Sequence, residues 1–240
     1  VLADGNGGTT ILGGAQDYKR IGEGDNGPNT GGMGACSPTS VMNKAMIDRV
    51  MSTIVQPVLQ ALDEEGNPYS GMLYCGLMLT DQGPKVVEFN CRFGDPETQV
   101  IVPRVADDLM MLLYASATGY LPVDRVNLTA KKAVCVILAS EGYPGNYEKG
   151  KPISGLGADD LASVVFQAGT TVKEGQLVTS GGRVLGVTGM GATIRAAAHN
   201  AYSRAEKITF DGRYLRRDIA WRELERANGN GKPAGGRKRK

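Results

Sequence analysis

Residues 86–99 read VVEFNCRFGDPETQ, a strand-like apolar run that leads into a turn dense in charged residues. Because alternate side chains of a strand point to the same face, Glu88, Asn90 and Arg92 are predicted to project together. A carboxylate and an amide oxygen suit a hard octahedral cation such as Mg²⁺, which also takes oxygens from substrate phosphates. Arg92 is suited to neutralise a developing phosphoryl charge. The stretch therefore predicts a metal and phosphate site on one strand face.

An ordinary hairpin with one polar, solvent-facing side is the competing interpretation, and it is the more frequent one for Glu-x-Asn alone. The alternation also predicts that Val87 and Phe89 face the core. The residues after the strand favour a functional site, because they concentrate more polar groups than an exposed turn needs. These groups are Arg92, Asp95, Glu97 and Gln99.

The segments around this stretch carry strand and helix patterns in turn. Residues 69–80 and 84–90 are β-rich runs joined by a short turn, which predicts an antiparallel hairpin in the core. Apolar residues recur at three- and four-residue steps over 47–62 and predict a helix with one buried face, kinked at Pro57. Further predicted elements are a hairpin within residues 1–20 and a helix over 107–116.

A second, smaller unit is predicted from about residue 128 onward. A strand pattern resumes at KKAVCVILAS, residues 131–140. Further strands are predicted over 163–170 and 176–189, and a helix over 192–208. Residues 226–240 have the composition of a solvated, disordered tail rather than of a nucleic-acid or targeting segment. The predicted fold class is α+β.

Residues 21–38 form a long segment too rich in Gly and Pro for a helix or a regular strand, and they are predicted to be a functional loop. The run NTGGMG offers consecutive backbone amides of the kind that bind anions, although it lacks the Lys-Ser/Thr ending of a P-loop. A flexible linker is the open alternative. Upstream, Asp17 and Lys19 belong to a polar cluster, for which surface ion pairs are the alternative interpretation.

Composition and charge narrow the class of protein. The formal charge is +2, but residues 226–240 supply six positive charges, so residues 1–225 carry 2 − 6 = −4 and give no electrostatic reason to expect nucleic-acid binding. His199 is the only histidine and has no nucleophile partner in the pattern, which argues against histidine-based nucleophilic catalysis.

Cysteine usage and hydropathy point to a cytoplasmic protein. The four cysteines show no C-x-x-C pairing, and Cys75 and Cys91 lie in or beside apolar strand-like runs where reduced, buried thiols are common. No apolar run reaches the roughly 20 residues that a membrane span needs. The start, VLADGNGG, has no signal-peptide pattern.

Two longer stretches carry a resemblance to a known family. They are AQDYKRIGEGDNGPNTGGMGACSP, residues 15–38, and EFNCRFGDPETQ, residues 88–99. Together they resemble the signature stretches of the phosphoribosylamine-glycine ligases, also called glycinamide ribonucleotide synthetases. The resemblance continues through EGYPGNYEKGKPISGL, FQAGT, TSGGRVLGVTG and RRDIAWRELE.

The resemblance implies a partial ATP-grasp domain over 1–127, an antiparallel sheet with helices, followed by a small α+β C-terminal domain over 128–225. It implies ATP-dependent ligation of glycine to 5-phosphoribosylamine, giving glycinamide ribonucleotide, ADP and phosphate. Mg²⁺ or Mn²⁺ would bind at Glu88 and Asn90. The implied catalytic residues are Arg92 and Asp95, and the implied substrate-binding residues are Asp17, Lys19, Gly31, Gly32 and Gly34.

The family's N-terminal nucleotide-binding-like domain and the lid of its ATP-grasp domain do not precede Val1. We therefore expect the sequence to be the C-terminal part of a longer protein, and the isolated chain to lack ligase activity. Two alternatives remain: another ATP-grasp carboxylate-amine ligase, since Glu-x-Asn followed by Arg recurs across that superfamily, and a non-catalytic binding module.

Overall fold

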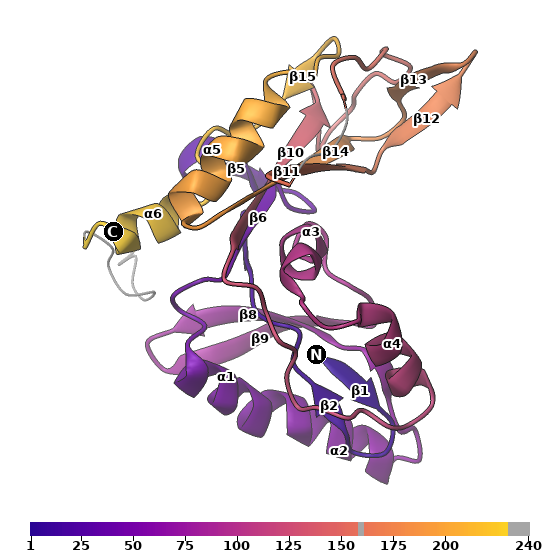
Figure 1. The fold of residues 1–240 in the computed structure, drawn as a ribbon, viewed down its shortest axis with the longest axis vertical. Coiled ribbons are helices and arrows are strands. Elements are labelled where there is room, and N and C mark those ends of the chain that lie inside the picture. The colour runs from indigo at the N-terminus through magenta and orange to yellow at the C-terminus, as the bar shows by residue number, and fades with distance from the viewer. Residues whose placement is uncertain (158–160, 230–240) are drawn as a thin grey trace.

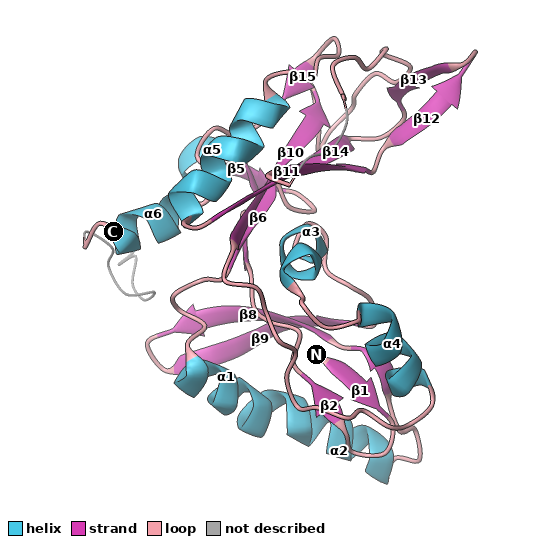
Figure 2. Ribbon diagram, in the orientation of Figure 1, coloured by secondary structure: helices cyan, strands magenta, loops and turns pink. Residues whose placement is uncertain are grey.

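The computed structural model describes residues 1–157 and 161–229, which fold into two units, drawn one above the other in Figure 1. Helices and strands occur in both units (Figure 2). Every pairing between named strands of the described residues is antiparallel. The predicted α+β class with antiparallel sheets is confirmed.

The lower unit is built on short strands and on helices that flank them (Figure 2). Its strands are β1 (Leu2–Asp4), β2 (Thr9–Thr10), β7 (Ser70–Met72), β8 (Tyr74–Thr80) and β9 (Gly83–Asn90). Its helices are α1 (Lys44–Val50), α2 (Gln56–Glu64) and α4 (Leu109–Ala117), and the short α3 (Thr98–Ile101) lies between the units. β1 lies between β2 and β7, and β8 pairs with β9, so both predicted hairpins are present.

The predicted long helix forms with a defect just before Pro57. α1 and α2 are joined by a π-helical segment, Met51–Val55, in which the Gln56 amide bonds Met51 O five residues back. Pro57 lies in the first turn of α2, directly after this segment, and it has no N–H to donate to the preceding turn. At the other end, the Asn43 side chain caps α1 by accepting from the Met46 amide at 2.9 Å.

The prediction that Val87 and Phe89 face the core is wrong. Val87 is 63% exposed and Phe89 37% exposed, and the strand is bulged where Gly76 pairs with Glu88 but Leu77 pairs with Val86. The bulge gives Val87 no partner on β8 and interrupts the alternation on which the prediction relied. The described residues place no layer over this part of β9.

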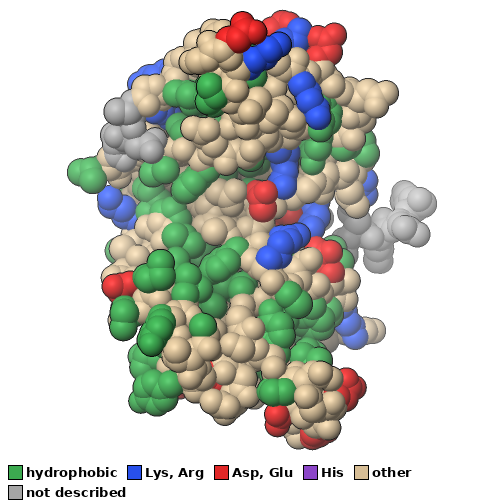
Figure 3. Space-filling view, turned by 90° about the vertical axis from the view of Figure 1, so that its right-hand side faces the viewer, with side chains coloured by type: hydrophobic (Ala, Val, Ile, Leu, Met, Phe, Trp, Pro, Cys, Tyr) green, Lys and Arg blue, Asp and Glu red, His purple; other side chains and the backbone are tan. Residues whose placement is uncertain are grey.

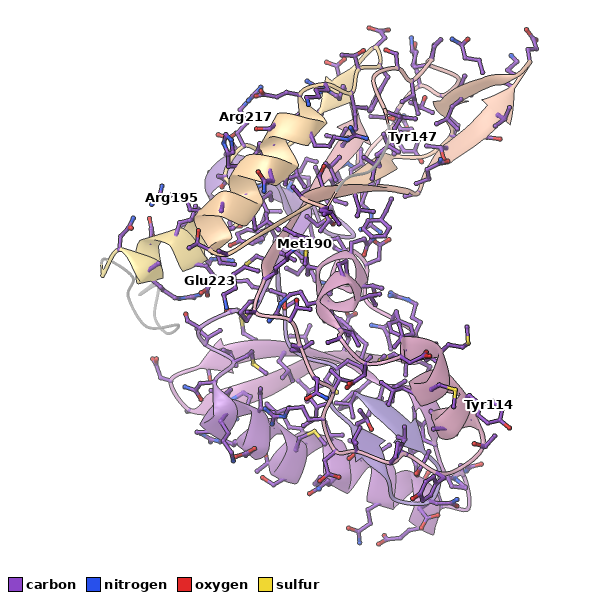
Figure 4. All side chains as sticks on the ribbon, in the orientation of Figure 1. Tyr114, Tyr147, Met190, Arg195, Arg217 and Glu223 are labelled. Atoms are coloured by element: carbon purple, nitrogen blue, oxygen red, sulfur yellow. The ribbon has the colours of Figure 1, made fainter. Side chains whose placement is uncertain are left out.

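α4 is apolar on nearly every side, and the helix predicted over 107–116 is confirmed. The Asp108 carboxylate accepts from the Met111 amide at 3.2 Å and caps its start. Leu112 is buried, whereas Tyr114 is 63% exposed and points outward in Figure 4. Figure 3 shows hydrophobic side chains gathered over the lower unit.

The upper unit has one main sheet, in the order β11-β14-β10-β6-β3, with β15 paired to β10. Its bounds are β3 (Gln16–Asp17), β6 (Gly34–Ser37), β10 (Lys132–Ser140), β11 (Ser163–Gln167), β14 (Arg183–Gly191) and β15 (Arg213–Tyr214). Separate two-stranded ribbons are formed by β4 (Arg20–Gly22) with β5 (Asn26–Asn29) and by β12 (Thr170–Lys173) with β13 (Gln176–Thr179). Helix α5 (Ile194–Ala205) packs on this sheet. It confirms the helix predicted over 192–208.

The segment 21–38 differs from the loop that its composition predicts, because it contains β4, a 3₁₀ turn, β5 and β6. β6 pairs with β10, and β3 extends the same sheet. These early strands therefore complete the sheet of the upper unit, so a cut at residue 127 does not separate two independent sheets. Pairing with a strand nearly 100 residues away leaves no local signature in a glycine-rich run.

The end of the described chain differs from the predicted tail. Arg226 and Ala227 belong to helix α6 (Trp221–Ala227), and Arg226 pairs with Glu223. Glu223 also accepts from Thr39 Oγ1 at 2.7 Å and from the Ser40 amide at 3.0 Å, which ties α6 to the chain leaving β6 (Figure 4). The rest of the predicted tail, 230–240, lies outside the described residues.

All four thiols are free: Cys36 and Cys135 are buried, Cys75 is half-buried and Cys91 is exposed. Burial raises the pKa of Cys36 and of Cys135 to about 12. The expectation of a buried setting for Cys91 is wrong, because that residue lies in the open turn after β9. In the part of the chain that the structure describes, no helix is long and apolar enough to cross a membrane.

Candidate functional site at the junction of the two units

Most of the predicted site residues meet where the turn after β9 approaches β3 and the loop before β6. Figure 3 shows acidic and basic side chains gathered at mid-height, between the two units. The turn belongs to the lower unit, whereas β3 and β6 belong to the upper sheet. The site is therefore formed by tertiary contacts between segments distant in sequence.

Lys19 connects β9 to β3. Its Nζ lies 3.3 Å from Glu88 Oε1 and 3.8 Å from Asp17 Oδ2. Glu88 and Asn90 are two residues apart on β9, beyond the bulge, and pair with Gly76 and Tyr74 of β8. Two of the predicted ligands thus project from the same side of one strand, with the Lys19 ammonium beside Glu88.

Asp17 is a buried carboxylate of the site that lacks hydrogen-bond donors among the described residues. Its side chain is 11% exposed, and neither of its oxygens has a hydrogen-bond partner in the described residues. Burial and the nearby charge of Glu97 raise the pKa of the Asp17 carboxyl to about 7. Glu97 is itself buried and accepts from the Tyr74 hydroxyl at 2.6 Å. Burial of the Tyr74 hydroxyl and the Glu97 charge beside it raise the pKa of Tyr74.

Arg183 at the start of β14 fastens the turn to the glycine loop. Its Nη2 lies 2.7 Å from Asp95 Oδ2, and its Nη1 donates to Asp95 O at 3.1 Å and to Gly31 O at 3.0 Å. Gln99 Nε2 donates to Asp95 Oδ1 at 3.0 Å. Because both oxygens of Asp95 accept internal hydrogen bonds, this geometry favours a positioning role for Asp95 over the catalytic role that the resemblance implies.

The three predicted glycines differ in what surrounds them. Gly31 donates its amide to the Tyr143 hydroxyl at 3.0 Å. Gly32 has φ +120°, and a Cβ there would lie 2.4 Å from Pro96 Cδ and 2.8 Å from Asp17 Oδ1. Gly34 is buried within β6, where a Cβ would lie 2.6 Å from Cys135 O, so this glycine serves packing. Gly31 and Gly32 are therefore part of the junction, whereas Gly34 lies inside the sheet.

Arg92 stands apart from the other predicted residues. Its side chain is exposed, and its Nη1 donates to Phe93 O at 2.9 Å. Its guanidinium remains available to solvent at the rim of the site.

The donor set fits a divalent cation that is held only in part by protein. No cluster of three or more His, Cys, Asp or Glu side chains in the described residues is arranged to hold a metal. Glu88 and Asn90 offer one carboxylate and one amide oxygen, and Mg²⁺ characteristically binds one or two carboxylates together with substrate phosphates and water. A cation here would need such outside ligands.

A cleft in the upper unit contains none of the predicted residues. It has a volume of about 450 Å³ and is lined in part by Glu148, Lys151 and Asp211. Lys151 Nζ lies 2.6 Å from Glu148 Oε2 and 3.0 Å from Asp211 Oδ2. Because these charges already pair with one another, the junction remains the better candidate.

Several residues at the junction were not predicted from the sequence. Arg183 and Tyr143 contact the glycine loop, and Tyr74 holds Glu97. The pair Gly181-Gly182 directly before Arg183 is a signal that could have directed attention there, because two glycines let the chain turn and approach its neighbours closely.

Two family models match this chain and define its class. Residues 1–98 match the family model "Phosphoribosylglycinamide synthetase, ATP-grasp (A) domain", and residues 133–222 match "Phosphoribosylglycinamide synthetase, C domain". The biotin carboxylase domain of Hydrogenobacter thermophilus 2-oxoglutarate carboxylase has the same fold, with a TM-score of 0.64 at 15% identity over 89% of this chain and 45% of that one. The chain thus combines ATP-grasp structure with a C domain.

Closer relatives identify the family. The phosphoribosylamine–glycine ligase of Agrobacterium fabrum is 47% identical over 212 residues, 88% of this chain and 50% of that protein. That of Pseudomonas aeruginosa is 48% identical over 217 residues, 90% of this chain and 51% of that protein. The crystal structure of the Thermotoga maritima ligase superposes with a TM-score of 0.79 at 40% identity, over 88% of this chain and 52% of that one.

The chain belongs to the phosphoribosylglycinamide synthetase family, as its signature stretches predicted. It spans about half the length of the curated relatives it matches.

Proposed function

We propose that the protein containing this chain ligates glycine to 5-phosphoribosylamine, using ATP and giving glycinamide ribonucleotide, ADP and phosphate in purine biosynthesis. The observation that best supports this proposal is the junction between the two units. There, in a chain of this family, Lys19 lies between Glu88 and Asp17. The names of the relatives support the same substrates.

The residues of the junction suit this reaction. Glu88 and Asn90 would hold Mg²⁺ or Mn²⁺, which supplies positive charge to nucleotide phosphates when bound. Arg92, exposed at the rim, is placed to bind an anionic substrate group, and Lys19 adds a second positive charge. Asp95 and Arg183 hold the turn and the Gly31-Gly32 backbone in place. Because a neutral amine is already a competent nucleophile, the ligation needs no strong base.

The partners under this proposal are small molecules: ATP, glycine and 5-phosphoribosylamine. The free thiols of Cys36, Cys75, Cys91 and Cys135 support a reducing compartment, and we propose the cytoplasm.

A chimaera tests the proposal, because the chain spans about half of its relatives. In the chimaera this chain replaces the matching half of the Agrobacterium fabrum ligase. We expect ADP release that requires both glycine and 5-phosphoribosylamine. Glu88→Gln should lower kcat/KM by about a hundredfold, the scale of losing one charge-stabilising group. Glu65→Gln, which neutralises an exposed carboxylate at the end of α2, is the matched control and should be neutral.

Three results would contradict the proposal. Folded chimaera with no glycine-dependent ADP release argues against this substrate. ADP release with another carboxylate but not with glycine favours a different ATP-grasp ligase. Full activity of Glu88→Gln at limiting Mg²⁺ or Mn²⁺ removes Glu88 from the metal site.

A further inference from the structure

The Asp17 carboxylate is buried without a hydrogen-bond partner for either oxygen in the described residues. Its side chain is 11% exposed, and no described group donates a hydrogen bond to Oδ1 or Oδ2. The closest cation, Lys19, is 3.8 Å from Oδ2, is 46% exposed, and lies nearer to Glu88 Oε1, at 3.3 Å. Burying a carboxylate without donors is unfavourable, so the fold retains at this position a group that lacks its binding partner.

The neighbouring backbone does not supply the missing donors. The Gly32 amide donates to Thr30 Oγ1 at 2.9 Å, and the Met33 amide donates to Tyr18 O at 2.8 Å. The Tyr18 amide donates to Gly34 O at 3.0 Å. These three amides therefore have their main partners elsewhere, although the Tyr18 amide lies near enough to Asp17 to lower the pKa of its carboxyl in part.

The charges around Asp17 favour a cationic partner. Among the described residues, Glu97 is buried beside it with a single side-chain donor, the Tyr74 hydroxyl, and Glu88 lies beyond Lys19. Three carboxylates thus outnumber the one lysine, and the nearby Arg183 is already paired with Asp95, so the inner end of the junction keeps a net negative charge. A compact cation with several N–H donors, such as a primary ammonium group, satisfies both the charge and the empty acceptors.

We propose that Asp17 binds the ammonium group of the amino-acid substrate, which is glycine under the function proposed above. Glycine keeps its ammonium group while its carboxylate reacts, so a buried carboxylate can hold that end throughout. Phosphoribosylamine fits this position less well, because its amine must be neutral to attack. Lys19 and Arg92 are left for the anionic ends of the substrates.

Binding to the intact 240-residue chain tests this assignment, with glycine and glycolate as probes. The two ligands differ only in that a hydroxyl replaces the ammonium group. We expect calorimetry or ligand-observed NMR to show that the unmodified chain binds glycine at least about tenfold more tightly than glycolate. Asp17→Asn should weaken glycine binding by about the same factor and abolish the preference. Glu65→Gln should retain both.

Two outcomes would overturn the inference. If the unmodified chain binds glycine no more tightly than glycolate, Asp17 does not recognise an ammonium group. If Asp17→Asn keeps the affinity for glycine, water is the partner of the carboxylate. Asn matches Asp in shape and removes a buried charge, so this variant is expected to fold, and a melting curve checks that.

The chimaera separates this inference from the proposed function. If it releases ADP with glycine but Asp17→Asn leaves the KM for glycine unchanged, the inference is wrong and the proposed function stands. If glycine binding depends on Asp17 but no ligation occurs, the proposed function is wrong and the inference stands.

Discussion

At the scale of single residues, Asp17 illustrates a site that costs stability. Burial and the Glu97 charge raise the pKa of its carboxyl in the folded chain to about 7, from an ordinary value of 3.8. Between these values the folded chain binds more protons than the unfolded chain, so stability falls as pH rises through this window. Above it the carboxylate is ionised in both states and the full penalty acts.

Asp17→Asn should therefore stabilise the chain in a pH-dependent way. The variant should gain on the order of 2–4 kcal/mol in free energy of unfolding at pH 8, and the gain should vanish toward pH 4. Urea denaturation at several pH values measures this. Asp63→Asn, at an exposed position of α2, is the control and should show no such trend. A gain that is independent of pH would mean that Asp17 does not titrate near neutrality.

At the scale of elements, α5 lies so close to β14 that the sheet beneath it has no room for a side chain. A Cβ on Gly189 would lie 2.2 Å from Ala197 O and 2.3 Å from Ala201 N. Both alanines are completely buried. The contact is thus built from small residues on both sides, as close helix packing on a sheet requires.

Gly189→Ala should force α5 away from the sheet and lower the free energy of unfolding by about 3 kcal/mol, the upper range for overpacking a core. His199→Ala changes an exposed residue of the same helix and should stay within about 0.5 kcal/mol of the parent chain. Urea denaturation compares the two. Equal stabilities would show that α5 can shift without loss of packing.

Elements with a strong local signal were predictable from the sequence. α4 and α5 combine apolar residues with capping side chains at Asp108 and Thr193, and both occur where the pattern places them. β9 was predictable as a strand but not in its exposure, because the bulge and the absence of a covering layer depend on tertiary context. β6 was missed because its partner, β10, lies far along the chain.

At the scale of the whole molecule, Arg183 is the link that local sequence could not reveal. Its contact with Asp95 spans 88 residues and joins the upper sheet to the turn of the lower unit. That Glu88 and Asn90 share one side of a strand was predictable, because they lie two residues apart on β9. The grouping of Lys19 with Glu88, by contrast, exists only once β3 has joined the upper sheet.

A double-mutant cycle on Arg183 and Asp95 measures how strongly the two units are coupled. The side chains are 20% and 42% exposed, so solvent screens the pair and the expected coupling is about 1 kcal/mol, below that of a buried pair. Arg183→Lys keeps the charge but cannot donate to Asp95 and to Gly31 O in the same fork geometry. In the chimaera we therefore expect Arg183→Lys to lower kcat/KM about tenfold with a loss of stability below about 1 kcal/mol.

The reason for this split is that Arg183 holds the backbone beside Asp17 rather than the core of either unit. Loosening it should displace the Gly31-Gly32 loop, against which Asp17 and Pro96 pack, while the sheets stay intact. Arg195→Lys, an exposed arginine on α5, supplies the matched control. Two results together would show that the units hold the site without this link. The effects of Arg183→Ala and Asp95→Ala on the free energy of unfolding would be strictly additive, and Arg183→Lys would keep full activity.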